Sequence, residues 1–250
     1  VTEMSTKKIF KHNENLEIVY GVHSISEVLQ AKKRKIYEVY VTQSKQNELA
    51  SLLKKLPTYT KVISCDKSKI EYVTKTSDHQ SIAALVAPFV YRQKFFNPKQ
   101  FPVILICDSV QDTKNMGALL RSAYCVNILG IVIPDKSTVS MTGSVLKSSA
   151  GLAEYLEIFL AKTTKFVLEE AKKAGYHIYL AAASGTSISA ISFKAPCCLV
   201  IGNEHAGINP ALFSYGEVVS LKQKNPFISY NASVAGGILL YEIANQLKLI

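Results

Sequence analysis

The sequence predicts a two-domain α/β protein: a small N-terminal α/β domain followed by a larger domain built on a parallel sheet. Three observations support this. The length of 250 residues suits two modest cores better than one. Hydrophobic residues make up 48% of the chain and charged residues 19%, which excludes wholesale disorder. Near-continuous apolar runs such as Val103–Cys107, typical of strands buried on both faces, recur after residue 100.

The first 90 residues alternate helical and strand patterns. Helices are predicted at residues 24–31 (capped by Ser24), 48–56 and 66–74 (capped by Asp66), and strands at residues 38–42, 60–64 and 81–87. Residues 91–102 are rich in proline and basic residues and show no regular period, so we expect an interdomain linker there. Its Phe95 and Phe96 are expected to dock on one of the domains.

Residues 103–250 form the second predicted domain. Apolar strands are expected at residues 103–107, 128–133, 156–159, 177–182, 198–201 and 218–221, separated by helices. Residues 233–247 end the chain as an amphipathic helix. This alternation predicts a parallel sheet with helices on both faces.

The net charge of +10 is unevenly distributed. Residues 1–100 carry 17 Lys and Arg against 9 Asp and Glu, whereas residues 101–250 carry 12 against 10. The N-terminal domain therefore suits a polyanion such as RNA, and solvated lysines that serve only solubility are the alternative. The likeliest contacts are four consecutive cations in a loop: Lys32, Lys33, Arg34 and Lys35.

Several classes of protein are excluded by missing signals. No run approaches the roughly 18 uncharged apolar residues of a membrane helix, and no secretory signal is expected. The five cysteines lack CxxC spacing and the five histidines are scattered, so we expect free thiols, a cytoplasmic location and no metal site. No phosphate loop, dinucleotide-binding GxGxxG or GxSxG elbow is present.

Three polar clusters follow predicted strands of the second domain, at the sheet edge where open α/β folds bind ligands. The first contains Asn115, Gly117 and Arg121 and predicts a helix capped by Asn115. The second runs from Gly202 to Gly207, and the third enters the last helix from Ser229. Each alone has a structural explanation: a capped helix with a surface arginine, a turn with two glycines, and a tightly packed helix start.

Taken in order, the clusters N-x-G-x-x-x-R-S-A, G-N-E-x-x-G and S-x-N-x-S-V-A-x-G-I-x-L-Y-E resemble the three motifs of the SpoU (TrmH) branch of the SPOUT methyltransferases. Residues 20–24 and 79–84 are similar to features of the ribosomal-protein-like RNA-binding domain carried by the bacterial RlmB group of this family. The resemblance covers nearly the whole chain.

The resemblance implies a homodimeric enzyme that transfers a methyl group from S-adenosylmethionine to an RNA ribose 2′-hydroxyl, with a trefoil knot in the catalytic domain. A guanosine of 23S ribosomal RNA is the expected target. Transfer RNA is an alternative target, and a non-catalytic RNA-binding protein with a degenerate fold is an alternative of another class. Residues 1–90 are then the RNA-binding domain and residues 103–250 the catalytic domain.

The resemblance also implies the site residues. The implied catalytic residues are Asn115, Arg121, Glu204, Ser229 and Asn231. The implied cofactor-binding residues are Ala182, Ala183, Gly185, Gly202, Asn203, Glu204, Gly207, Leu221, Tyr230, Asn231 and Ala232. The resemblance implies that Arg121 contacts RNA and acts as the base of the reaction. Because a guanidinium rarely gives up its proton, the alternative is that Arg121 orients the ribose and stabilises the developing alkoxide. The third motif departs from the family's I-P-M-x-G-x-x-x-S-L-N at Lys222, Gln223, Asn225 and Tyr230.

Overall fold

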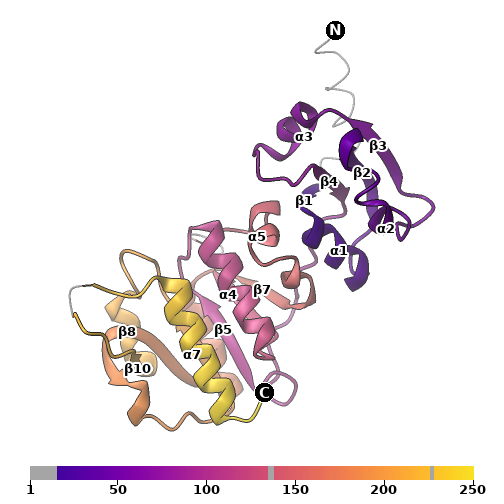
Figure 1. Ribbon diagram of the computed structural model, residues 1–250. Coiled ribbons are helices and arrows are strands. Elements are labelled where there is room, and N and C mark those ends of the chain that lie inside the picture. Colours follow the sequence, from indigo (N-terminus) through magenta and orange to yellow (C-terminus); the bar gives the residue numbers. More distant parts are fainter. Residues whose placement is uncertain (1–15, 135–137, 226–227) are drawn as a thin grey trace. The chain divides into compact units, whose positions relative to one another are not determined.

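The computed structural model describes residues 16–134, 138–225 and 228–250, so the part of the third motif at 226–227 lies outside the described residues. The chain divides into two compact units, Val1–Val90 and Tyr91–Ile250, whose elements are labelled in Figure 1.

The N-terminal unit contains a four-stranded mixed sheet. The strands β1 (Glu17–Tyr20), β4 (Ile82–Val86), β2 (Ile36–Thr42) and β3 (Lys61–Cys65) lie in that order. The β2 and β3 strands are parallel, and β4 is antiparallel to both of its neighbours. Consecutive residues of the inner strands, such as Val39 and Tyr40, are both buried, and their side chains point to opposite faces of the sheet. The sheet is therefore covered on both faces, by α1 (Val22–Ala31) and by α3 (Lys67–Thr74).

Two predicted helices of this unit differ from the structure. The N-cap of α1 is Gly21, at φ 87°, and Ser24 lies buried inside the helix rather than capping it. A positive φ is the backbone conformation that glycine adopts at no cost, so the chain turns at Gly21. The predicted helix at 48–56 is reduced to one turn, α2 (Ala50–Leu53), because only Leu49 and Leu52 there are buried against the unit.

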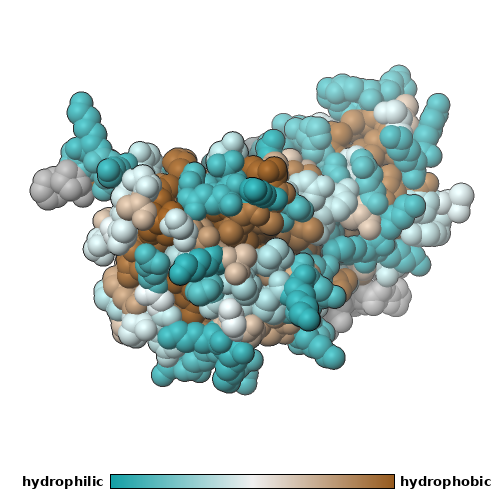
Figure 2. Space-filling model, turned by 90° about the horizontal axis from the view of Figure 1, so that it is seen from below, coloured by the Kyte–Doolittle hydropathy of each residue, from teal (hydrophilic) through white to brown (hydrophobic). Residues whose placement is uncertain are grey.

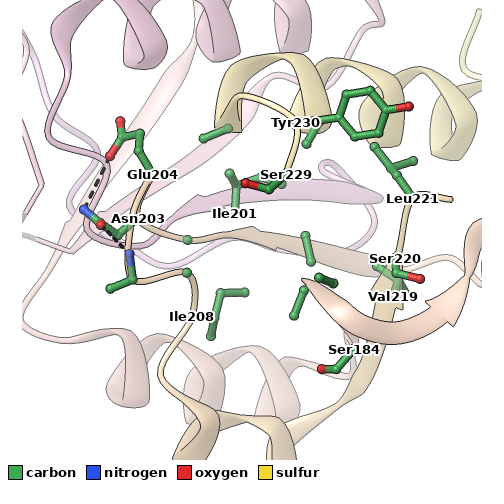
Figure 3. Close-up of a pocket in the computed structure, with 18 of the residues that line it drawn as sticks. Ser184, Ile201, Asn203, Glu204, Ile208, Val219, Ser220, Leu221, Ser229 and Tyr230 are labelled. Atoms are coloured by element: carbon green, nitrogen blue, oxygen red, sulfur yellow. Dashed lines mark hydrogen bonds between the residues drawn. The ribbon is translucent and has the colours of Figure 1, made fainter. Parts of the chain in front are cut away.

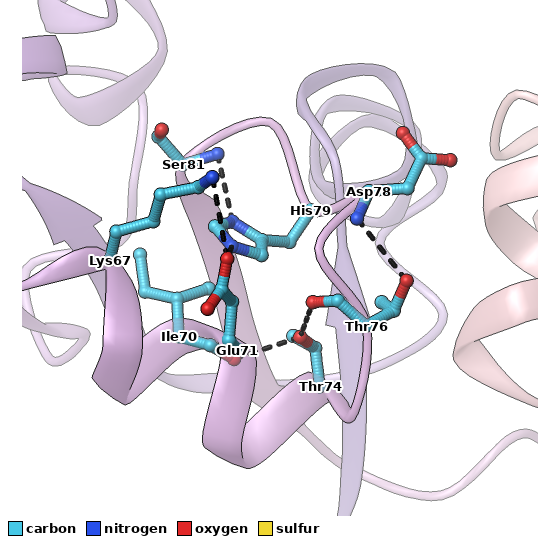
Figure 4. A network of polar contacts seen from close by, with 8 residues as sticks. All are labelled: Lys67, Ile70, Glu71, Thr74, Thr76, Asp78, His79 and Ser81. Carbon is cyan, nitrogen blue, oxygen red and sulfur yellow. Dashed lines mark hydrogen bonds and ion pairs between the residues drawn. The ribbon is translucent and has the colours of Figure 1, made fainter.

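A buried histidine ties α3 to the start of β4 (Figure 4). The His79 side chain is fully buried, and its Nδ1 accepts a hydrogen bond of 3.0 Å from the backbone N–H of Ser81. Since Nδ1 accepts, the ring proton lies on Nε2, which is 3.9 Å from Oε1 of Glu71 on α3. This contact lets a turn with two left-handed residues, Gln80 and Ser81, lead into a fully buried strand.

The C-terminal unit contains the predicted parallel sheet. Its six strands lie in the order β10 (Glu217–Ser220), β8 (His177–Ser187), β9 (Cys197–Ile201), β5 (Val103–Cys107), β6 (Gly130–Pro134) and β7 (Glu157–Ala161). All neighbouring pairs are parallel. Cys197 and Cys198 are consecutive and both buried, as expected for a strand covered on both faces. Cys107 lies on the adjacent strand β5. Burial raises the pKa of its thiol to about 12, so the thiol stays protonated.

Helices cover the two faces of this sheet. On one face α4 (Thr113–Cys125) packs against α5 (Gly143–Ser148) and against α7 (Ala232–Gln246), which lies beside it in Figure 1. On the other face α6 (Thr164–Ala174) packs on β6, β7 and β8. Figure 2 shows that hydrophobic residues still reach the surface of this unit between hydrophilic ones.

The predicted linker at 91–102 packs on the C-terminal unit. Its Phe96 is 3% exposed, and Phe95 makes edge contacts with Phe159 and Tyr176, so the pair docks as expected. The backbone N–H of Arg92 also donates a 2.7 Å hydrogen bond to the carbonyl of Ile158. These residues therefore form part of the C-terminal core.

The packing of α4 on α5 predicts different effects for two glycine substitutions. A Cβ at Gly117 would lie 2.3 Å from Cβ of Ser148, so Gly117→Ala should destabilise the unit by about 1–3 kcal/mol. A Cβ at Gly237 in α7 would lie 3.4 Å from Oγ of Ser122, and the helical gain of alanine should leave Gly237→Ala neutral or stabilised by up to about 1 kcal/mol. Calorimetric melting of both variants checks this, and equal losses of stability would contradict the packing.

Candidate active site

A hollow opens at the carboxyl edge of the sheet, where β8 separates from β9. Pairing between these strands ends at Leu180 and Val200. On its other side β8 pairs Leu180 with Val218 and then Thr186 with Val219, so residues 181–185 bulge between two consecutive positions of β10. The result is a cavity of about 490 Å³ walled largely by small side chains and backbone (Figure 3).

The loop after β9 forms one wall of this hollow, and Asn203 holds its shape. Its backbone pairs with Gly207 in both directions, at 3.2 and 3.0 Å. The Asn203 Oδ1 accepts hydrogen bonds from the backbone N–H groups of His205 (2.9 Å) and Ala206 (3.0 Å), and Nδ2 donates to the carbonyl of Ser109 (2.8 Å). The Asn203 side chain and the backbone of the loop therefore fix its conformation, and the side chains of Glu204 and His205 line the cavity.

Nine of the eleven predicted cofactor residues line the hollow. They are Ala182, Ala183, Gly202, Asn203, Glu204, Gly207, Leu221, Tyr230 and Ala232. Gly185 does not line it: a Cβ there would lie 2.5 Å from the carbonyl carbon of Val218, and its own carbonyl accepts a hydrogen bond from Ser220 Oγ (2.8 Å). The strand predicted at 177–182 extends to Ser187, so Gly185 belongs to the long strand β8.

Sequence reasoning missed the apolar part of the lining. Ile208 and Phe213 follow the second motif, and Val219 lies beside the bulge of β8. Ser184 and Ser220 add polar atoms at the same end, as Figure 3 shows. The one sequence signal for this lining is the apolar Ile208 directly after the Gly202–Gly207 loop. In the sequence, such a residue looks the same as an ordinary core residue.

A second, more polar hollow of about 510 Å³ adjoins the first. It is lined by Gln111, Asp112, Asn115, Glu204, His205, Ser229, Tyr230, Asn231 and Ala232. Five of these residues also line the first hollow: Glu204, His205, Ser229, Tyr230 and Ala232. The two hollows therefore share an edge, and a group bound in one faces a group bound in the other.

A chain of hydrogen bonds crosses the second hollow and brings three predicted catalytic residues together. The Nδ2 of Asn115 donates to Glu204 Oε1 at 3.0 Å. Ser233 Oγ, which the sequence did not single out, lies 3.2 Å from Asn115 Oδ1 and 2.7 Å from Asn231 Oδ1. Because a hydroxyl has one proton, Ser233 donates to one of these amides at a time.

The helix caps at this site differ in part from the prediction. Asp112, not Asn115, caps α4: its Oδ1 accepts from the backbone N–H groups of Lys114 (2.7 Å) and Asn115 (2.9 Å). This leaves the Asn115 amide free to bond Glu204, since a carboxylate already satisfies the helix start. Asn231 is the N-cap of α7, and it also lines the second hollow.

Arg121 lines neither hollow. It is exposed on α4, six residues after Asn115 and thus about 240° further round the helix. Within one copy of the chain, the structure does not bring Arg121 to the other four predicted catalytic residues.

The predicted basic run in the N-terminal unit is also divided by the structure. The Arg34 side chain is 1% exposed, bonds Glu17 Oε2 at 2.7 Å and stacks over Phe89. It stabilises the unit and is withdrawn from the predicted RNA contacts. Lys32, Lys33 and Lys35 are exposed.

The first hollow has the size and chemistry of a small-molecule site. Its volume falls within the range for ligands of drug size, and glycines at its wall allow close approach of backbone. Among the described residues, no three potential ligand side chains gather as a metal site would require. No helix within residues 16–134, 138–225 and 228–250 is long and apolar enough to cross a bilayer.

Two family models match the chain. The SpoU rRNA Methylase family matches residues 102–241, and a model described as RNA 2′-O ribose methyltransferase substrate binding matches residues 18–92. The chain belongs to the SpoU family. It is an S-adenosylmethionine-dependent RNA 2′-O-ribose methyltransferase with a substrate-binding domain.

Individual relatives agree with this family. "Uncharacterized tRNA/rRNA methyltransferase slr0955" of Synechocystis is 30% identical; the match covers 93% of this chain but 63% of that longer protein. The 23S rRNA (guanosine-2′-O-)-methyltransferase RlmB of Shewanella oneidensis is 26% identical over 92% of this chain and 97% of its own length. An AdoMet-bound rRNA methyltransferase structure from Sinorhizobium meliloti has the same fold, with a TM-score of 0.76 at 19% identity over 96% and 91% of the two chains.

The hydrogen bonds of Asn203 predict its effect on the hollow. Asn203→Ala removes four side-chain hydrogen bonds, three with backbone groups and a longer one with Glu204 at 3.4 Å. Each contributes about 1 kcal/mol to the loop, so affinity for S-adenosylmethionine should fall about tenfold or more. Asn209→Ala is a matched control, since Asn209 accepts one bond from Ala211 N–H and does not line the hollow. Calorimetric titration of both variants measures the difference, and equal affinities would show that Asn203 does not shape the site.

Proposed function

We propose that this chain methylates the ribose 2′-hydroxyl of a guanosine in 23S ribosomal RNA. S-adenosylmethionine occupies the hollow between β8, β9 and β10, and the acceptor ribose occupies the adjoining polar hollow. The observation that carries this proposal is the edge shared by the two hollows, formed by residues of the second and third motifs. With this occupancy, a methyl donor and a hydroxyl acceptor face each other across the shared edge.

The residues at this edge suit an in-line displacement. S-adenosylmethionine supplies an electrophilic methyl group, so the protein's main task is to align the attacking oxygen. Asn115 and Asn231 hold amide groups toward the ribose hollow, and Glu204 and Ser233 fix their orientations. The changed third motif is compatible with cofactor binding, since Gln223 and Tyr230 themselves line the first hollow.

Ribosomal RNA is the first candidate because the RlmB relatives, whose names specify 23S rRNA and guanosine, match the chain over nearly their whole length. Transfer RNA is the second candidate, named with ribosomal RNA in the Synechocystis relative. We also propose a cytoplasmic location, where this RNA is processed and where the five free cysteines stay reduced. Mapping 2′-O-methyl nucleotides in RNA from a deletion strain, before and after restoring the gene, tests the substrate; a nucleotide restored only in transfer RNA would overturn it.

A homodimer is supported by an exposed apolar stripe on α7. Val234, Ile238 and Tyr241 are exposed at i, i+4 and i+7, which places them on one helix face. Arg121 is exposed on α4, the helix that packs beside α7. We propose that two copies pack through this region and that Arg121 of each copy serves the ribose hollow of the other copy.

The dimer proposal predicts complementation between two inactive variants. Arg121→Ala and Asn231→Ala should each abolish methylation while keeping affinity for S-adenosylmethionine. A mixed dimer, isolated by two different affinity tags, has one site with both residues intact and should recover about half of wild-type activity. A mixed dimer as inactive as its parents would show that Arg121 does not act across the interface.

RNA recruitment is assigned to an exposed basic and aromatic surface of the N-terminal unit. Lys35 stacks over the rings of Tyr37 and Tyr59, and Lys32 and Lys33 lie just before it in the sequence. Aromatic rings beside cations suit the bases and phosphates of RNA.

The salt dependence of RNA binding tests this surface. Replacing Lys32, Lys33 and Lys35 with Ser should make the slope of log K for RNA binding against log salt shallower by up to about 2–3. The reason is that a phosphate no longer contacted by a lysine keeps its counterions when RNA binds. Replacing three exposed lysines of α6, Lys165, Lys172 and Lys173, is the charge-matched control. Equal slopes for the two triple variants, measured by filter binding, would show that the N-terminal lysines are only a solvated surface.

A further inference from the structure

His205 lies where the two hollows of the C-terminal unit meet. It lines both of them, and it is exposed at the tip of the loop after β9. We infer that the His205 imidazole is the base that accepts the proton of the ribose 2′-hydroxyl during methyl transfer. The inference deepens the proposed function and rests on its placement of ribose and cofactor.

The other titratable side chains of the ribose hollow are unsuited to this role. Asp112 accepts two backbone N–H groups as the cap of α4. Glu204 accepts the amide of Asn115 at 3.0 Å and approaches the N–H of Asp112 at 3.4 Å. The hydroxyl of Tyr230 donates to the backbone carbonyl of Lys222 at 3.4 Å. Among the described residues that line this hollow, His205 therefore offers a ring nitrogen that can accept a proton, and an imidazole is the commonest general base in enzymes.

The loop holds His205 at this edge through its backbone. The N–H of His205 donates to Asn203 Oδ1 at 2.9 Å, and the paired backbones of Asn203 and Gly207 close the loop below it. The backbone is thus fixed while the imidazole remains open to the hollow. A base must reach the proton that it abstracts, and a fixed loop with an accessible side chain at the substrate's edge meets that requirement.

The proposed step is balanced without another reactant. The O–H bond of the 2′-hydroxyl breaks as the new oxygen–methyl bond forms, and the imidazole takes the proton. The carbon–sulfur bond breaks with its electron pair remaining on sulfur, so the sulfonium becomes a neutral thioether. The imidazolium then returns its proton to water, since the loop tip is exposed.

Replacing the imidazole tests the inference. His205→Gln keeps a polar side chain of similar length and should lower kcat by about 10²–10³, with affinity for S-adenosylmethionine and KM for RNA within a factor of about three. Wild-type kcat should rise with pH to a plateau, and the variant should lose this inflection. His177→Gln is the control, since His177 is exposed at the opposite edge of the sheet, at the start of β8, and should match wild type.

The assay uses whichever RNA the wild-type protein methylates, so failure of the ribosomal target leaves this test intact. Histidine-labelled protein with S-adenosylhomocysteine supplies a second readout: addition of that RNA should shift the imidazole resonance of His205 and leave that of His177 in place. An undiminished kcat with an unchanged pH profile in His205→Gln would overturn the inference. So would a His205 resonance that does not respond to RNA.

Discussion

The separation of β8 from β9 after Leu180 is the constraint on which the site depends. A parallel sheet that stayed paired to its edge would fill this region with backbone hydrogen bonds and leave no room for a ligand. The bulge at residues 181–185 and the early end of the β8–β9 ladder remove those bonds. The Gly202–Gly207 loop then enters the space, and its own asparagine compensates for the missing ladder.

The edge between the two hollows is held together by hydrogen bonds between three segments of the chain. The contacts that orient it are amide, hydroxyl and carboxylate hydrogen bonds, joining α4, the loop after β9 and the start of α7. These three segments are far apart in sequence, and each brings one partner of the network. A change in the packing of α7 on α4 would therefore disturb the amides of Asn115 and Asn231, which line the second hollow.

The sequence predicted the strands of the parallel sheet well, because continuous apolar runs such as Val103–Cys107 arise from burial on both faces. It failed where neighbouring residues compete for one role. Asp112 and Asn115 are both good caps three residues apart, and only the fold shows which one serves α4. In the sequence, Arg34 is one of four consecutive cations, and only the fold brings Glu17 beside it and buries its side chain. The bulge in β8 and the knot implied by the family resemblance leave no local pattern to predict from.

The docking of Phe95 and Phe96 has a consequence for how this architecture can be recombined. The aromatic pair belongs physically to the catalytic core although it precedes the first strand of that core. An exchange of substrate-binding domains between relatives would keep the receiving core intact if the crossover fell between Val90 and Tyr91. A crossover at Phe101, which looks equally natural from the strand pattern, would import foreign aromatic residues into the packing around Tyr176.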